Sequence, residues 1–266
     1  MSPHVASFFH PDSNTFSYVV HDPATRQAAV IDPVLDYDPD THAIGAGPLQ
    51  PLLAHVREHA LEVRWLLETH AHADHVSAGR WLKQSFPQAA LAMGGGIVEV
   101  QRTFAPRYGL DVPTDGSQFD HLFADGERFD VGAIAAEVIA VPGHTSDSVA
   151  YRIGDALFTG DSLFMPDGGT ARCDFPGGDA ALLYRSIQRL LALPDATRVF
   201  ICHDYGPGGR EVANETTIGE QRARNIHLHD GVSEAAFVAT RQARDATLAE
   251  PKLMHPSVKA NIQGGA

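Results

Sequence analysis

Short apolar runs alternate with amphipathic segments along most of the chain, and this alternation predicts its secondary structure. Runs rich in β-branched and aromatic residues, bounded by Gly, Pro and Asp, are typical of strands, whereas apolar residues three and four positions apart are typical of helices. Strands are expected at 16–20, 28–31, 63–67, 89–93, 118–122, 127–129, 135–141, 148–153, 156–159 and 198–202. Helices are expected at 49–61, 78–86, 179–191, 215–225 and 233–248, with a loop at 36–47, a glycine turn at 94–96 and an irregular tail at 251–266.

Groups of strands that alternate with helices favour a fold of the α/β class. Two sheets packed together, with helices on their outer faces, would form a four-layer α/β/β/α sandwich. No internal repeat or low-complexity linker interrupts the pattern. We therefore expect a single domain over residues 1–266, with a core at about 10–230 and a C-terminal helix and tail at 231–266.

Charge and composition exclude several kinds of partner. The chain has 20 Lys and Arg against 33 Asp and Glu, a net charge of −13, whereas nucleic acids and anionic membranes bind cationic surfaces. The N-terminal residues lack the features of a secretion signal, and no apolar stretch approaches the length that spans a bilayer. Two cysteines, Cys173 and Cys202, cannot form a disulfide framework. We expect a cytoplasmic protein that binds neither nucleic acid nor membrane.

The densest cluster of candidate metal-binding residues lies directly after the expected strand 63–67. There the sequence reads Thr69-His70-Ala71-His72-Ala73-Asp74-His75. Because side chains alternate along a strand, His70 and His72 project the same way, and Asp74 and His75 can turn inward as the next helix begins. So many polar groups beside a buried strand are costly unless something binds them. The HxHxDH pattern therefore predicts a metal site.

Three further residues of metal-binding type follow apolar runs. They are His144 after 135–141, Asp161 after 156–159, and His203 after 198–202. Each alone is typical of a turn or cap residue. Together with the HxHxDH segment, in this order, they indicate one metal centre built at the ends of several strands.

These motifs resemble the metallo-β-lactamase superfamily over roughly residues 10–230. The resemblance rests on HxHxDH followed by Gly143-His144, Gly160-Asp161 and His203-Asp204-Tyr205. It implies the αββα metallo-β-lactamase sandwich, in which loops at one edge converge on one or two metals. It nominates as ligands His70, His72, Asp74, His75, His144, Asp161 and His203. These seven permit two metals bridged by Asp161, or one metal with the other groups as hydrogen-bonding neighbours.

Further segments are similar to the persulfide dioxygenases of this superfamily. They are Arg172-Cys173-Asp174-Phe175, then Leu183-Tyr184-Arg185-Ser186, and the stretches 244–248 and 256–262. The likeness implies one Fe(II) per chain, held by the catalytic residues His70, His144 and Asp161, with the remaining four ligand candidates around it. It implies oxidation of glutathione persulfide by O₂ and water to glutathione and sulfite, in a homodimer. Arg172, Tyr205 and His227 are the implied substrate-binding residues, although some relatives carry Arg at the position of His227.

Other interpretations stay open from sequence. A glyoxalase II-like hydrolase of glutathione thioesters would use two metals, zinc included, and would employ Asp74, His75 and His203 as ligands. A metal-binding module without catalysis is the third alternative. Arg172 could instead form an ion pair with Asp174 or Asp161, and Tyr205 could be a packed loop aromatic. Cys173, beside Arg172, could be a redox-sensitive or an ordinary loop thiol. The other nine histidines lack clustered ligand spacing and are expected in surface or core roles.

Overall fold

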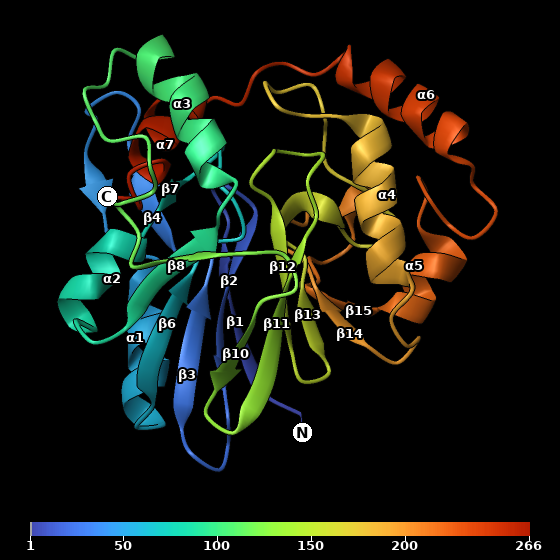
Figure 1. Ribbon diagram of the computed structural model, residues 1–266. Helices are drawn as coiled ribbons and strands as arrows, with labels where there is room; N and C mark the ends of the chain where they lie inside the picture. Colours follow the sequence, from blue (N-terminus) through green and yellow to red (C-terminus); the bar gives the residue numbers. More distant parts are fainter. Residues whose placement is uncertain (1) are drawn as a thin grey trace.

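Two mixed sheets pack face to face, and helices cover the outer face of each (Figure 1). The computed structural model describes residues 2–266. The first sheet has the order β1 (His4–His10), β2 (Thr15–His21), β3 (Gln27–Ile31), β6 (Glu62–Leu67), β8 (Ala90–Gly94) and β9 (His121–Phe123). The second has the order β10 (Arg128–Val131), β11 (Ile134–Ala140), β12 (Val149–Ile153), β13 (Ala156–Phe158), β14 (Arg198–Phe200) and β15 (Glu215–Thr217). A small third sheet joins β5 (Ile44–Gly45), β4 (Val34–Tyr37) and β7 (Val76–Ser77).

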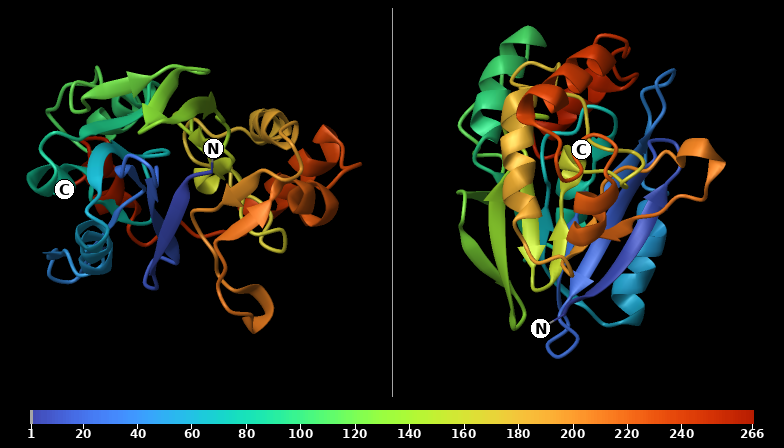
Figure 2. Two further views of the ribbon diagram at one scale, coloured as in Figure 1. Left: turned by 90° about the horizontal axis from the view of Figure 1, so that it is seen from below. Right: turned by 90° about the vertical axis from the view of Figure 1, so that its right-hand side faces the viewer.

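Two groups of helices flank the sheets, and the view from below in Figure 2 separates them. The first sheet packs against α1 (Leu49–Glu58), α2 (Gly79–Ser85), α3 (Ile97–Arg107) and α7 (Met254–Asn261), and the second against α4 (Ala180–Leu191), α5 (Ile218–Arg224) and α6 (Glu234–Asp245). Along β2, Val19 faces the helices while Tyr18 and Val20 face the other sheet, as the two-residue period requires. These layers confirm the expected αββα sandwich.

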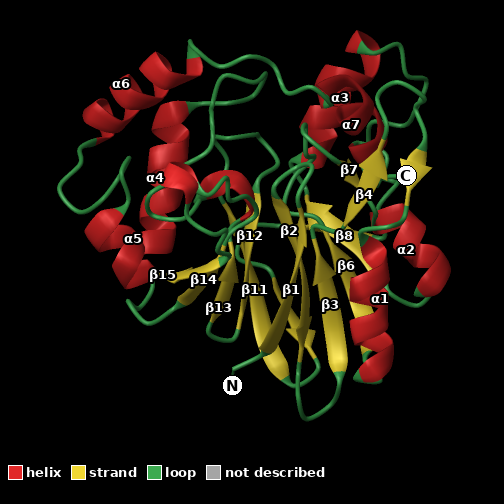
Figure 3. Cartoon of the chain, turned by 180° about the vertical axis from the view of Figure 1, so that it is seen from behind, coloured by secondary structure: helices red, strands yellow, loops and turns green. Residues whose placement is uncertain are grey.

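Strand direction places several strand ends at one edge of the sandwich. In the second sheet β11 and β13 are both antiparallel to β12, and β14 is parallel to β13. The carboxyl ends of β11, β13 and β14 therefore share an edge. Figure 3 shows loops gathered above the strands, between the helix groups. A bridge between Thr15 and His203, with the Phe16 N–H donating to the Cys202 carbonyl at 2.7 Å, ties the first sheet to this edge.

Some elements differ from those predicted. The tail, expected to be irregular, contains α7, and Met254 and Val258 of this helix, with Ile262 just after it, pack into the core of the first sheet. Helix α3 was not expected, and the segment expected as one helix at 215–225 divides into β15 and α5 at Thr217, which caps α5 by accepting from the Glu220 N–H. Within residues 2–266, no helix has the length and apolar character needed to cross a membrane.

Candidate metal centre

His70, His144 and Asp161 come together at the shared edge, although they lie far apart in sequence. They follow β6, β11 and β13 respectively, and all three are buried. One possible ligand atom of each lies within 4.8 Å of the others. Asp161 Oδ2 is 3.9 Å from His70 Nε2 and 3.6 Å from His144 Nε2. Two imidazoles and one carboxylate therefore face a common point.

A second group adjoins the first. Possible ligand atoms of His72, Asp74, His75 and His203 also lie within 4.8 Å of one another. His203 Nε2 is 3.4 Å from Asp74 Oδ2 and 3.2 Å from Asp161 Oδ1. Asp161 therefore presents one oxygen to each group, as a bridging ligand must.

Hydrogen bonds fix which nitrogen of each imidazole is free. The Nδ1 of His144 donates to the Arg172 carbonyl at 2.7 Å, which leaves Nε2 with the lone pair. His72 donates from Nε2 to Asp32 at 3.1 Å, which leaves Nδ1. The Nδ1 of His70 contacts Thr69 Oγ1 at 3.1 Å, and since Thr69 donates that hydroxyl to Asp32, it accepts from His70.

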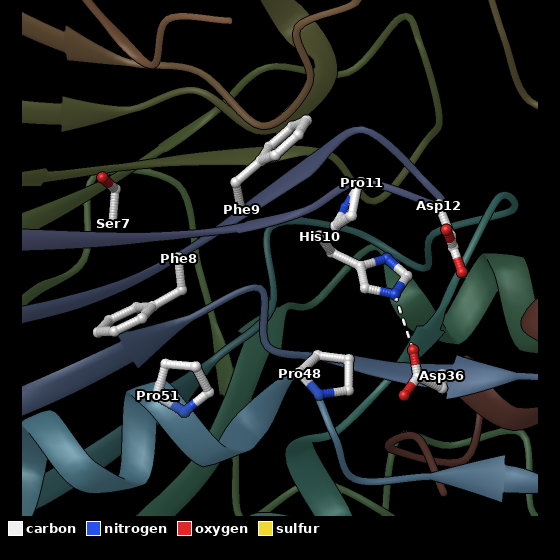
Figure 4. A pocket seen from close by; sticks show the side chains of 9 residues that line it. All are labelled: Ser7, Phe8, Phe9, His10, Pro11, Asp12, Asp36, Pro48 and Pro51. Carbon is white, nitrogen blue, oxygen red and sulfur yellow. Dashed lines mark hydrogen bonds and ion pairs between the residues drawn. The ribbon is translucent and has the colours of Figure 1, made fainter.

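In the second group, a series of hydrogen bonds that runs inward from the surface determines which imidazole nitrogens are free. Figure 4 shows its outer end, where His10 of β1 points to Asp36 of β4 in a pocket of about 460 Å³. Asp36 accepts from Nε2 of His10 at 3.0 Å. When Nδ1 of His10 accepts from the Ser13 hydroxyl, 2.7 Å away, Ser13 in turn accepts from Thr15 at 2.7 Å. Thr15 Oγ1 then accepts from Nδ1 of His203 at 3.2 Å and of His75 at 3.4 Å. The Nε2 of both rings is thereby left free.

The nitrogens left free in this way are also the ones that make no hydrogen bond in the structure. Buried side-chain atoms without a hydrogen bond include His70 Nε2, His72 Nδ1, His75 Nε2 and His203 Nε2. Buried polar atoms in native proteins are otherwise nearly always satisfied. Burial lowers the pKa of His70 and His72 well below the ordinary value, so both rings keep a lone pair at neutral pH. This donor set fits one or two divalent transition metals.

Two glycines allow the backbone to place the metal-ligating side chains that follow them. Gly143, at φ +139°, precedes His144, and a Cβ there would lie 2.3 Å from the backbone nitrogen of Leu183. Gly160, at φ +51°, precedes Asp161, and its Cβ would lie 2.6 Å from Thr69 Oγ1. Only glycine fits both the backbone angle and the close approach. The Gly-His and Gly-Asp pairs of the sequence therefore have a steric cause.

Sequence reasoning missed Asp32, which supports the HxHxDH loop. It accepts from the Thr69 N–H at 2.7 Å, from the Thr69 hydroxyl at 2.9 Å and from His72. Its φ of +47° is unusual for a residue with a side chain, and such conformations gather at functional sites. Asp32 follows a buried strand, so the signal that identified His144 and Asp161 applies to it as well.

Asn261 of α7 also supports the loop from the C-terminal segment. Its side-chain amide donates to the carbonyls of His72 and His75, both at 2.8 Å, and accepts from the Ser77 N–H. We expect Asn261→Ala to weaken metal retention by about 10- to 100-fold, as loss of an outer partner does in metal sites. Dialysis against a chelator with elemental analysis measures this. Lys259→Ala on the same helix serves as control, and equal retention in the two variants would refute the role of Asn261.

A cavity of about 710 Å³ opens onto the first group of ligands. His144, Asp161 and Asp74 line it, together with the aromatic residues Phe164, Phe175 and Tyr205. Four cationic side chains also line it, Arg172, Arg241, Arg244 and Lys252. Arg172 and Arg241 pair with Asp174 and Asp245, so the lining cations without an ion pair among residues 2–266 are Arg244 and Lys252.

Arg172 and Tyr205 lie on the cavity wall. Arg172 pairs with Asp174 through two contacts of 2.6 and 2.7 Å and donates to the Ala249 carbonyl. The structure therefore contains the ion pair with Asp174 that the sequence left open as an alternative. Its guanidinium also stacks over Phe175 at 4.7 Å. Tyr205 is 62% exposed and lies parallel to the His203 ring. Contact of either residue with substrate stays a prediction.

His227 lies behind the wall rather than on it. It is buried, and its Nδ1 accepts from the Thr170 N–H at 3.0 Å. A Cβ on Gly169 would lie 2.2 Å from that nitrogen, so the ring packs directly under the 169–170 segment. The structure therefore gives His227 a place in supporting the wall.

Stability should depend on pH through His227. Burial, together with the nearby Arg241 and Arg244, lowers its pKa to about 4, whereas the unfolded chain takes up this proton near pH 6.5. The contribution of the neutral His227 ring to the free energy of unfolding is complete above pH 6.5 and is lost as the pH falls toward 4. We expect metal-free His227→Asn, whose amide oxygen can accept from Thr170, to lose less stability than wild type between pH 7 and 4.5 in urea unfolding. The exposed His229→Asn should match wild type. If the free energy of unfolding changed equally with pH in all three proteins, the assignment would be refuted.

Both cysteines are buried. Burial raises the pKa of Cys173 to about 12, because Arg241 only partly offsets the loss of hydration. Cys202 directly follows β14, and its sulfur lies within 4.8 Å of possible ligand atoms of Asp161 and His203. The thiol of Cys173 is therefore protonated at neutral pH, which favours the ordinary loop thiol over the redox-sensitive residue.

Comparisons with known proteins agree with this geometry. A "Beta-lactamase hydrolase-like protein" of Xylella fastidiosa is 49% identical over 99% of this chain, which spans only 61% of the length of that relative. "Glyoxylase B2" of Dictyostelium discoideum is 45% identical over 96% of this chain and 88% of its own, and human "Persulfide dioxygenase ETHE1, mitochondrial" is 28% identical over 97% and 87%.

Among solved structures, ETHE1 from Myxococcus xanthus superimposes with a TM-score of 0.79 and 32% identity, over 99% of this chain and all of that one. The family model described as "Metallo-beta-lactamase superfamily" matches residues 10–203, which contain all seven candidate ligands. With the fold, the ligand order and these matches in agreement, the chain belongs to the metallo-β-lactamase superfamily.

Proposed function

We propose that the protein is an iron-dependent persulfide dioxygenase, which converts glutathione persulfide, O₂ and water to glutathione and sulfite. The observation that carries the proposal is the cavity that joins a set of two histidines and one aspartate to a cation-rich wall. The likeness to the ETHE1 structure over nearly the whole of both chains supports it. Because the chain spans part of its bacterial relative, the proposal concerns this segment.

The residues present fit the metal that the proposal needs. His70, His144 and Asp161 would hold Fe(II), which supplies redox chemistry and leaves positions open for a sulfur ligand and O₂. The bond from His144 to the Arg172 carbonyl holds that imidazole in place and ties the ligand to the cavity wall. Thr69 holds His70 in the tautomer that ligation at Nε2 requires, and Asp32 holds His72 in place beside it.

The cavity wall accounts for an anionic substrate. Glutathione carries two carboxylates, and Arg244 and Lys252 line the cavity without an ion pair to any described residue. They are free to bind those carboxylates, whereas Arg172 is held by Asp174. The rings of Phe164, Phe175 and Tyr205 offer apolar surface to the rest of the tripeptide and limit water beside the sulfur.

Oxygen uptake tests the proposal. Protein reconstituted anaerobically with Fe(II) should consume one O₂ and release one sulfite per glutathione persulfide. Arg244→Gln and Lys252→Gln should raise KM with little change in kcat or iron content, because they bind the distant part of the substrate. Lack of O₂ uptake by iron-loaded wild-type protein would reject the proposal.

A glyoxalase II-like thioester hydrolase is the second candidate. The observation that favours it is the complete second group, His72, Asp74, His75 and His203, with Asp161 placed to bridge. The names of the bacterial and Dictyostelium relatives also include a hydrolase and a glyoxylase. Two metals per chain and hydrolysis of S-lactoylglutathione, without O₂ uptake, would establish this function in place of the dioxygenase.

A further inference from the structure

Three histidines far apart in sequence meet at the opposite end of the first sheet. His4 begins β1 and His21 ends β2, and the two are direct partners in the strand register. His55 lies in the last turn of α1. Possible ligand nitrogens of the three rings all lie within 4.8 Å of one another. The fold thus assembles a cluster that the sequence spacing did not indicate.

This histidine cluster, His4, His21 and His55, is remote from the metal centre. Thr15, at the other end of β2, contacts the imidazoles of the centre. The six residue steps from Thr15 to His21, at about 3.3 Å each, span about 20 Å. Figure 1 draws the N-terminus and the turn between β2 and β3 at the lower end of the sheet, away from the loops of the centre.

The cluster contains buried nitrogens without partners. His21 Nδ1 and His55 Nε2 are buried and make no hydrogen bond. Burial first, and then the neighbouring rings of His4, His55 and His59, lower the pKa of His21 to about 4. Burial and His59 likewise lower the pKa of His55. The carboxylate nearest to His21 in sequence, Asp22, is occupied by Ala24, Thr25 and Ala133.

We propose that His4, His21 and His55 form a separate binding site for Zn²⁺. Three neutral imidazoles are a donor set that holds zinc, with water in the fourth position. Nitrogens at about 2.1 Å from zinc stand about 3.4 Å apart in a tetrahedron, so small rotations of the side chains close the site. His59, whose ring centroid lies 4.1 Å from that of His55, is the nearest further imidazole.

The site would join α1 to the hydrogen-bonded strand pair β1 and β2, which the helix otherwise meets through packing. β1 is an edge strand of the first sheet, and α1 covers that sheet from outside. A metal held by one residue from each of β1, β2 and α1 fixes the edge strand and the helix to each other. Since zinc would bind here only in the folded chain, it should raise the melting temperature.

Zinc stoichiometry tests the proposal in tag-free protein. After equilibrium dialysis at a micromolar free Zn²⁺ concentration, wild type should hold one zinc more per chain than His4→Gln or His55→Gln. The exposed His229→Gln should match wild type. His144→Ala, which disables the main centre, should retain the extra zinc and its rise in melting temperature, so the two sites are counted separately.

The exposed His4 is the main test because substitution of buried His21 could unfold the chain. Both His4→Gln and His55→Gln should keep the activity of the loaded wild-type enzyme, since neither touches the centre. Equal zinc content and equal zinc-induced shifts in wild type, His4→Gln and His55→Gln would overturn the proposal.

Discussion

Asp161→Asn is expected to lower kcat/KM by more than the roughly 100-fold that loss of an outer partner costs, and to release metal. Asp161 offers Oδ2 to His70 and His144 and Oδ1 to His203, so it belongs to both groups of ligands. Asparagine keeps the size of the side chain but replaces one anionic oxygen with an NH₂ that cannot ligate. Elemental analysis and oxygen uptake measure the two effects.

The same variant separates one metal from two. If a single metal is bound by His70, His144 and Asp161, wild type reconstituted with iron holds one iron at this centre and the variant close to none. If two are bridged, wild type holds two and the variant loses more than one. Asp195→Asn is the matched control, because Asp195 is an exposed carboxylate that pairs with Arg222 and does not line the cavity. Full activity and metal content in Asp161→Asn would show that this carboxylate is not a ligand.

Ligand types were predictable from sequence because each stands where an apolar strand ends. No local rule places His, Asp and His-Asp directly after β6, β13 and β14, so their repetition indicated one shared edge. How the ligand candidates divide between the two groups was not predictable from sequence. The HxHxDH segment contributes His70 to one group and His72, Asp74 and His75 to the other, and that division depends on where β11, β13 and β14 bring their own side chains.

Supporting residues were harder to find because their role arises only from tertiary contact. Thr15 sits at the start of an ordinary strand, yet its hydroxyl faces two imidazoles from distant segments. Asn261 lies in a segment expected to be irregular. Pro256 falls in the first turn of α7, where a missing N–H costs no helical hydrogen bond. The helix then carries Asn261 to the metal loop.

Arg241→Met is expected to destabilise the fold by about 3–5 kcal/mol, because it leaves a buried carboxylate unpaired. Arg241 is 2% exposed and pairs with Asp245, which is 6% exposed and one helical turn later in α6. Arg241 also donates to the Thr170 carbonyl at 2.8 Å, and Asp245 accepts from the Cys173 N–H at 2.8 Å. The pair therefore fastens α6 to the cavity wall.

Removal of both charges should restore much of that loss. In Arg241→Met with Asp245→Asn no buried charge remains, and the asparagine oxygen can still accept from Cys173, so we expect more than half of the lost free energy of unfolding to return. Urea unfolding of the single and double variants measures this. Arg222→Met, which breaks an exposed pair with Asp230, should change stability little. If Arg241→Met were no more harmful than Arg222→Met, the buried pair would not hold α6 against the wall, and the cavity would depend on apolar packing alone.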